Sequence, residues 1–310
     1  MRRIILLPII LLLTMTHFTG CSTAKSWYEK GTDSVISMSS KIIPGRTPVL
    51  KKKVLLLPLL DQAEIGEEKT EEITADLIKL LEQDGHLVIK RSEIPLQNTA
   101  GIRSPELGII IPPELAQMSE EMGMNVLITG VLSPFEITTK KTGIWPWRRF
   151  KKEIEISFIL NVFDITSGTL FITNLEKGKT TQDVETTDER EVKTEIVEAM
   201  FDREITHILY RHASTIKGVL NSHPWTGRLL SISNDKIMIN AGKDVRIKAG
   251  NVFVVYEGGE PIRTASGQPL YLRGSKVGEI KIAEVKEHYA LAVPLTGKQF
   301  KPGHLIRLKR

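Results

Sequence analysis

The sequence predicts an α+β protein with a mixed β-sheet covered by helices, followed by a small all-β barrel or sandwich. Between residues 51 and 217, short apolar runs alternate with repeats of helical spacing. Residues 218–310 instead hold short strands separated by turn residues. The 310 residues are 41% apolar and 25% charged, which is typical of globular proteins. That length suits one or two domains, each large enough to bury a core.

The first predicted strand covers residues 53–60, an apolar run (KVLLLPLL) typical of a buried strand. A helix follows, with acidic residues in its first turn and Gly85 at its end. Its apolar positions recur at helical spacing: Ile73, Leu77, Leu80 and Leu81. Residues 86–90 (HLVIK) form the next predicted strand.

A second helix is expected to begin at Pro112-Pro113 and to end at Gly123. The strand at 126–132 (VLITGVL) comes next. Residues 154–164 and 169–175 then form a hairpin, because a Ser-Gly turn separates two apolar strand patterns.

A long helix closes this first predicted domain. Thr186 and Glu189 have the spacing of a capping box. The apolar residues that follow form one stripe: Val192, Ile196, Met200, Ile205 and Leu209. The predicted order is therefore β-α-β-α-β-β-β-α.

Residues 221–224 (NSHP) are expected to end this helix and to open the β domain at 218–310. Six strands are predicted there: residues 228–233, 236–240, 252–256, 277–285, 289–293 and 305–308. Turns are expected at Asn234-Asp235 and at Gly258-Gly259. So many short strands in so short a stretch indicate a barrel or sandwich.

The N-terminus resembles a bacterial lipoprotein signal. Arg2 and Arg3 precede an apolar run at 4–13, which is too short to span a bilayer but fits residues 1–20 as a signal peptide. The run leads into Phe18-Thr19-Gly20-Cys21, which resembles the lipobox of that family except at Phe18, where leucine is usual. An ordinary signal peptide or an uncleaved anchor is the alternative.

Cys21 is the only cysteine, so it excludes an internal disulfide and a cysteine metal cage. The resemblance implies that its thiol carries a lipid, and several acyl chains anchor a protein firmly. Ser22 follows in place of Asp, which in Gram-negative lipoproteins implies the outer membrane, facing the periplasm. Residues 21–50, rich in Ser, Thr, Lys and Gly, are expected to act as a flexible tether.

The domain at 51–217 resembles the curli-secretion (CsgG-like) lipoprotein family and the N-terminal domain of TolB. The resemblance rests on the series KVLLLPLLD, GHLVIKRSE, MGMNVLITGVLSPF and FILNVFDITSGTLF. It implies a non-enzymatic protein that builds a secretion pore, reaches partner proteins in the periplasm or supports an envelope machine.

The domain at 218–310 is similar to the C-terminal domain of flagellar assembly protein T. The similar stretches are GRLLSISNDKIMINAGKDVRIKAGNVFVVYEGG, VGEIKIAEVKEHYALAVPL and KPGHLIRLK. That family is not usually lipid-anchored, so flagellar assembly is one option beside secretion and cell-wall machinery.

One segment departs from the curli-secretion pattern. Residues 138–152 are expected to be an extended hairpin tip that contains Trp145, Trp147, Arg148, Arg149 and Phe150. Aromatic residues beside arginines suit a protein interface or a lipid headgroup boundary. The alternative is a basic loop whose tryptophans fold back on the domain. The lysines and arginines there argue against membrane-spanning strands of a pore.

The sequence gives little indication of nucleic-acid binding, metal binding or catalysis. Removal of the signal peptide would take away Arg2 and Arg3 and leave 40 basic and 37 acidic residues. So small a net charge is weak evidence for nucleic-acid binding, and we expect no nucleic-acid partner. His207 and His212 lie five apart on one helix, so they point to different faces and do not form a metal pair. No phosphate loop or nucleophile elbow occurs.

The sequence therefore predicts a lipid-anchored periplasmic adaptor that binds envelope proteins, without enzymatic activity, cofactor or metal. Its site residues would be Cys21 for lipidation and Trp145, Trp147, Arg148, Arg149 and Phe150 for partner binding. The alternatives are an oligomeric curli-type secretion component and a periplasmic hydrolase. A homo-oligomer is compatible with the adaptor.

Overall fold

The structure is a computed structural model, and Val49–Arg310 form one compact unit in it. It describes residues 49–92, 119, 122–145, 147–184, 194–233, 236–263 and 269–309. Cys21, the expected signal peptide, most of the expected second helix, Thr186 and Glu189 lie outside these residues. So does the expected tether up to residue 48, but its last residue, Leu50, is buried, so the tether was predicted to extend too far.

The first half of the unit is a seven-stranded mixed sheet. Its strands are β1 (Lys52–Leu56), β2 (Leu60–Asp61), β3 (Leu87–Arg91), β4 (Val126–Leu132), β5 (Glu136–Thr142), β6 (Arg149–Asp164) and β7 (Thr169–Val184). The order is β3-β1-β4-β6-β5, with β2 beside β4 and β7 beside β6. β1 runs parallel to β3 and β4, whereas β6 is antiparallel to β4, β5 and β7.

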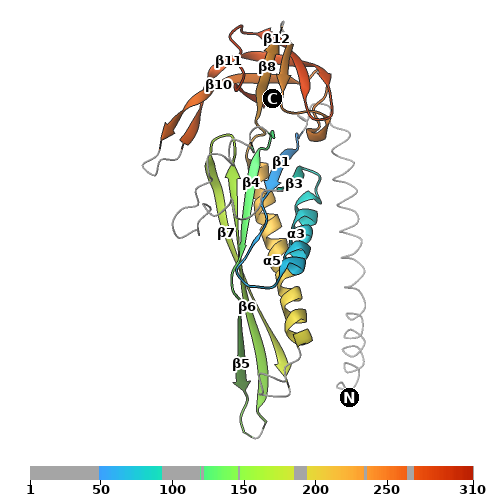
Figure 1. Cartoon of the computed structure of the whole chain (residues 1–310), viewed down its shortest axis with the longest axis vertical. Helices are drawn as coiled ribbons and strands as arrows, with labels where there is room; N and C mark the ends of the chain where they lie inside the picture. Colours follow the sequence, from blue (N-terminus) through green and yellow to red (C-terminus); the bar gives the residue numbers. More distant parts are fainter. Residues whose placement is uncertain are drawn as a thin grey trace, which may run out of the picture. The chain divides into compact units, whose positions relative to one another are not determined.

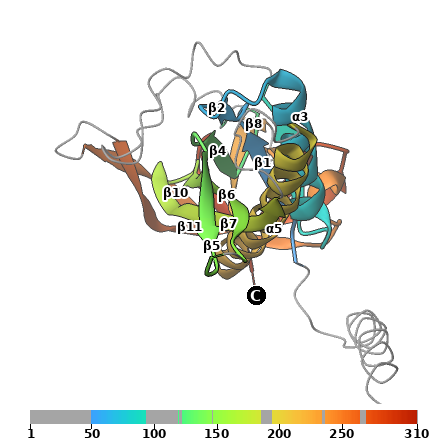
Figure 2. The ribbon, with the colours of Figure 1, turned by 90° about the horizontal axis from the view of Figure 1, so that it is seen from below.

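Two described helices, α3 (Glu67–Glu82) and α5 (Thr194–Ser222), cover one face of this sheet (Figures 1 and 2). Apolar residues four apart on α3 are buried: Ile73, Leu77 and Leu81. They share one core with Ile208 of α5 and Phe158 of β6. Since each fully buried apolar side chain contributes about 1.5–3 kcal/mol, this layer is a main source of stability.

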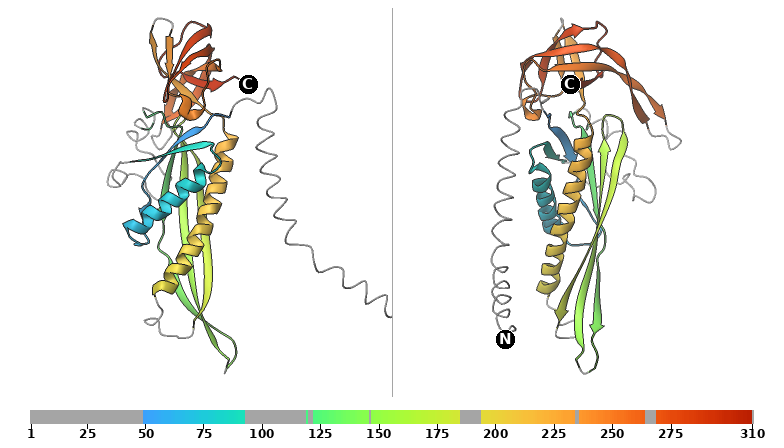
Figure 3. Two further views of the ribbon diagram at one scale, coloured as in Figure 1. Left: turned by 90° about the vertical axis from the view of Figure 1, so that its right-hand side faces the viewer. Right: turned by 180° about the vertical axis from the view of Figure 1, so that it is seen from behind.

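β6 joins the helix-covered sheet to a projecting ribbon. β7 pairs with it over nearly its whole length. On its other side, β4 pairs with Phe158–Asp164 and β5 pairs with Arg149–Glu155. Its 16 residues span about 50 Å at roughly 3.3 Å per residue. The ribbon of β5, β6 and β7 therefore carries the turn between Thr142 and Arg149 far from Asp164 (Figures 1 and 3).

Three details of the predicted strands were wrong. The single strand expected at 53–60 is two strands, β1 and β2, which flank Pro58, a residue without a backbone N–H. The expected hairpin strands are longer, since β6 starts at Arg149 and β7 continues to Val184. Most of the polar strand β5 lies within the hairpin tip expected at 138–152. It was not predicted as a strand, because its register is set by β6 and not by an apolar pattern.

The second half of the unit is a closed barrel, which confirms the α+β class. Its strands are β8 (Gly227–Ser233), β9 (Lys236–Ile239), β10 (Val252–Arg263), β11 (Pro269–Val285), β12 (Ala290–Thr296) and β13 (Leu305–Leu308). The closed order is β10-β11-β12-β9-β8-β13, and each pair is antiparallel. Phe253, Ile280 and Ile237 fill the barrel, and Leu50 joins this core from the residues before β1.

The prediction of a turn at Gly258-Gly259 was also wrong. Gly258 lies inside β10 and pairs with Arg273, and the hairpin continues to the pair Arg263 and Pro269. Three register shifts lie between Val255 and Pro261, so these glycines mark bulges in a long hairpin. The other expected turn, Asn234-Asp235, lies outside the described residues. In the described part of the chain, no helix is both long and apolar enough to cross a membrane.

Candidate functional site

The turn between β5 and β6, taken with Arg149 at the start of β6, carries a cluster of exposed apolar side chains. We call residues 143–149 the tip. Ile144 is 83% exposed, Trp145 is 75% exposed and Trp147 is 81% exposed. The tryptophans therefore do not fold back on the sheet. Exposed large aromatic residues clustered in this way mark interaction sites more often than inert surface.

The backbone of the tip is closely held at its start. Gly143 has φ of +93°, a conformation that L-residues rarely adopt. A Cβ at this position would lie 2.5 Å from the backbone oxygen of Trp147, so no larger residue fits without a shift. The hydroxyl of Thr142 donates to the carbonyl oxygen of Arg149 across the hairpin. The glycine thus allows the two strands to approach while Trp145 and Trp147 project outward.

Basic side chains lie directly behind this apolar apex. Arg148 and Arg149 are exposed, and Phe150 is half-buried. The Lys141 ammonium lies 5.4 Å from the centre of the Phe150 ring, which is a cation–π contact. Of the five predicted site residues, four are exposed to solvent, and Phe150 instead supports a neighbouring lysine.

An ion ladder ties the three ribbon strands together below the tip. Glu153 of β6 accepts from Lys140 of β5 at 2.8 Å and from Lys179 of β7 at 2.7 Å. These hydrogen bonds hold the pKa of Glu153 below its usual value. Lys140 and Lys179 share this one carboxylate, so the three groups keep a net positive charge while they stabilise the base of the tip.

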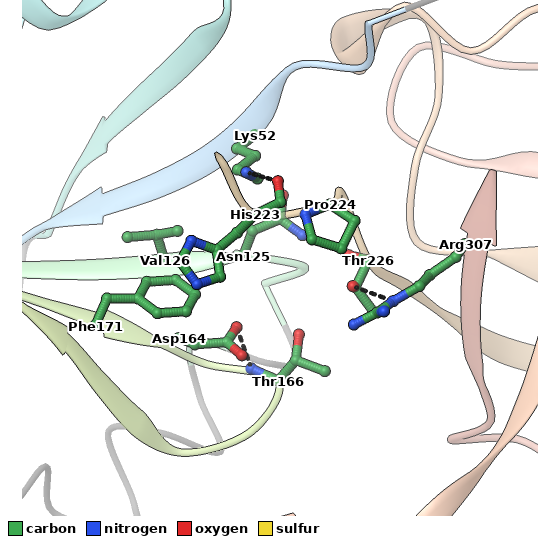
Figure 4. A pocket seen from close by; sticks show the side chains of 10 residues that line it. All are labelled: Lys52, Asn125, Val126, Asp164, Thr166, Phe171, His223, Pro224, Thr226 and Arg307. Atoms are coloured by element: carbon green, nitrogen blue, oxygen red, sulfur yellow. Dashed lines mark hydrogen bonds between the residues drawn. The ribbon is translucent and has the colours of Figure 1, made fainter. Parts of the chain in front are cut away.

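A second candidate is a pocket between the end of the sheet and the barrel (Figure 4). It encloses about 370 Å³, part of which is open solvent. It is lined by Lys52, Asn125, Val126, Asp164, Thr166, Phe171, His223, Pro224, Thr226 and Arg307. Burial lowers the pKa of Lys52 to about 8, while the charge of Asp164 acts in the opposite direction. A lysine with a lowered pKa is a candidate catalytic base.

The contacts of these pocket residues indicate a structural role. The Lys52 ammonium donates to the carbonyl oxygens of Leu220 and His223 at the end of α5, where a positive charge is favourable. Asp164 accepts from the backbone N–H of Thr166 and from the hydroxyl of Ser167. Lys52 therefore holds the helix end, and Asp164 holds the turn that follows it in the sequence.

Polar contacts at the same junction link the sheet to the barrel. Asn125 accepts from the backbone N–H of Lys53 at 2.9 Å and donates to the carbonyl oxygen of Thr226 at 2.6 Å. The Lys53 ammonium lies 2.8 Å from the carboxylate of Asp244. Sequence reasoning missed this network, because its members are far apart in sequence and belong to no motif.

The histidines considered for metal binding do not come together. His207 is exposed, whereas His212 is fully buried between α5 and the sheet. His212 contacts the Asn174 amide nitrogen at 2.9 Å and the Phe158 carbonyl oxygen at 3.1 Å. Among the described residues, no three His, Cys, Asp or Glu side chains are placed to hold a metal ion.

No family model and no curated protein matches this chain. Several solved structures share part of its fold distantly. The hypothetical protein CT253 from Chlamydia trachomatis is 17% identical with a TM-score of 0.36, over 53% of this chain and 96% of that one. A PelC dodecamer from Paraburkholderia phytofirmans is 10% identical with a TM-score of 0.30, over 56% and 91%.

Lipoprotein GNA1162 from Neisseria meningitidis is 10% identical with a TM-score of 0.28, over 49% of this chain and 96% of that one. The chain thus has a distant structural similarity to bacterial lipoproteins. Similarity at this level carries no argument about function. The resemblances to curli-secretion lipoproteins, TolB and flagellar assembly protein T stay predictions from the sequence.

Proposed function

We propose that this protein is a lipid-anchored binding and assembly module of the bacterial envelope, held at the outer membrane through Cys21 and facing the periplasm. The observation that carries the proposal is the N-terminal pattern, in which a cationic start and an apolar run end at the only cysteine after Thr19-Gly20. The domain boundaries at 51–217 and 218–310 belong to the same proposal. It assigns the chain no enzymatic role.

The tip is the part of the folded unit that we assign to partner contact. Two exposed tryptophans and two exposed arginines lie within five consecutive residues there. Tryptophan and arginine are enriched where binding energy is concentrated. Lys52 and Asp164 of the junction pocket are instead bonded to backbone groups at the helix end and the turn, which supports a binding role over a catalytic one.

Replacing Cys21 with serine tests the anchor. The acyl chains attach through the thiol, so we expect the Cys21→Ser protein to lose lipid labelling and to appear as an unprocessed precursor. We expect Ser22→Ala, which keeps the thiol, to be labelled and processed as before. Metabolic labelling with a fatty acid and immunoblotting of cell fractions measure both. Unchanged labelling of Cys21→Ser would contradict the proposal.

A photoreactive residue at position 145 tests the tip. Because the Trp145 side chain projects into solvent, we expect a photoreactive residue at this position to form a discrete crosslink in intact cells, either to a protein or to phospholipid. The matched control is position 210, where Tyr210 is 65% exposed on α5. Equal capture from both positions would show that the tip is not a specific contact site.

A further inference from the structure

The tip has the layered chemistry of a membrane interface. Its apex consists of Ile144, Trp145 and Trp147, and the positive charges of Arg148 and Arg149 follow directly behind. In a bilayer, tryptophan rings favour the headgroup level, and arginine pairs with lipid phosphates. Because the apolar side chains extend furthest, they would enter the boundary first while the charges stay at its surface.

The charge of the tip is positive and only partly compensated. Glu153 forms salt bridges with Lys140 and Lys179, and the Asp183 carboxylate lies 3.7 Å from the Lys151 ammonium. Within the described residues, the ion pairs include none that neutralises Arg148 or Arg149. Such basic residues attract an anionic lipid surface over about one Debye length.

Size favours a bilayer over a protein partner. A buried tryptophan removes about 150–250 Å² from water, so Ile144, Trp145 and Trp147 together offer on the order of 500 Å². A standard protein–protein interface buries about 800 Å² on each partner. The apex is also a convex turn, which would need a matching concave partner, whereas a headgroup layer adapts to it.

The chain is long enough for the tip to reach the membrane that carries Cys21. The described unit begins beside the barrel, where the N–H of Lys51 donates to the carbonyl oxygen of Val245 at 3.1 Å. The tip lies about 50 Å away along β6. The 28 residues from Cys21 to Val49 can span at most about 90–100 Å.

We infer that the tip inserts into the headgroup layer of an anionic phospholipid bilayer, the one that holds the lipid anchor. This rests on the proposed function, since it names the partner of the contact site assigned there. The protein would then touch the membrane at two places, the anchor and the tip. Protein partners would bind other surfaces, such as the faces of the barrel.

Tryptophan fluorescence of residues 49–310 tests the inference without the anchor, because this stretch is one compact unit that contains the hydrophobic cores of the sheet and the barrel. It contains three tryptophans, and the third, Trp225, is buried in the barrel. We expect a blue shift on adding vesicles that contain phosphatidylglycerol and none with pure phosphatidylcholine. The shift should weaken with added salt.

Variants separate the two layers of the tip. Replacing Arg148 and Arg149 with glutamine should weaken vesicle binding by about thirtyfold, given the strength of each arginine near an anionic surface. Trp145→Ser with Trp147→Ser should abolish binding in a vesicle flotation assay. The matched controls, Lys248→Gln with Lys298→Gln in the barrel and Tyr210→Ser on α5, should bind as the unchanged protein does.

Two results would overturn the inference. One is the absence of binding to phosphatidylglycerol vesicles. The other is binding that survives the double tryptophan replacement. If crosslinking from position 145 then captured a protein, the tip would be a protein interface, and the proposed function would stand without this inference. If Cys21→Ser kept its lipid label while the vesicles bound the tip, the anchor assignment alone would fail.

Discussion

Replacing Lys53 with methionine is expected to lower the free energy of unfolding by about 3–5 kcal/mol, because it leaves a largely buried carboxylate without its cation. The Lys53 ammonium and the Asp244 carboxylate lie 2.8 Å apart, and their side chains are 6% and 13% exposed. Lys53 belongs to β1 and Asp244 to the short 3₁₀ helix η3 (Lys243–Val245) of the barrel. The pair therefore links the sheet to the barrel.

Asp244 is held by several donors. Its carboxylate also accepts from the backbone N–H groups of Gly242 and Val245 and lies 3.1 Å from a ring nitrogen of His288. Burial by itself raises the pKa of Asp244, but the hydrogen bonds from Lys53 and His288 outweigh it and lower the pKa. The carboxylate thus stays charged at neutral pH, and removing its main cation is costly.

Guanidinium denaturation at neutral pH measures the effect of Lys53→Met. The matched control is Lys286→Met, which breaks an exposed pair with Glu284 and should leave stability nearly unchanged, because water screens exposed charges. Adding Asp244→Asn to Lys53→Met should restore part of the lost stability, because it removes the unpaired charge. Equal losses for Lys53→Met and Lys286→Met would show that the buried pair does not hold the junction.

Most strands and helices could be predicted where their buried positions form a regular pattern of apolar residues in the sequence. The strand at 126–132 was predicted at its observed bounds, because both faces of β4 are buried and its residues are mostly apolar. The existence of the six barrel strands was also predicted, but β10 and β11 are longer than expected, because Gly258 lies inside their hairpin and not at a turn. β5 could not be, because its residues are mostly polar and exposed and only pairing with β6 makes them a strand.

Of the two candidate sites, the tip could be predicted from the sequence and the junction could not. The tip was predicted from local composition, because two tryptophans and two arginines within five residues form a signal that needs no tertiary information. The junction was missed, because Lys53, Asn125 and Asp244 are joined only by the closure of the barrel against the sheet. Lysine, asparagine and aspartate are common surface residues, so nothing in the sequence marks these three as buried. Only their burial at the junction makes them link the sheet to the barrel.

Lowering the pH from 6.5 to about 4 is expected to cost about 3 kcal/mol of stability through His212 alone. Burial lowers the pKa of this histidine from 6.5 to about 4, and the hydrogen bond to Phe158 only partly opposes the shift. The ring lies edge-on to Phe158, with centres 5.0 Å apart, and no exposed surface remains for hydration. The folded protein therefore keeps His212 neutral where the unfolded chain binds a proton.

The direction follows from which state takes the proton. Between pH 6.5 and about 4 the unfolded chain binds more protons than the folded one, so the free energy of unfolding falls as the pH falls. Burial also lowers the pKa of His304, which adds to the slope in the same direction. The measurement is therefore a comparison of denaturant midpoints for the unchanged protein and His212→Leu across this range. His212→Leu should be less stable at neutral pH but lose about 3 kcal/mol less on acidification, whereas replacing the exposed His207 should leave the slope unchanged. A slope as steep in His212→Leu as in the unchanged protein would mean that other groups cause the acid sensitivity.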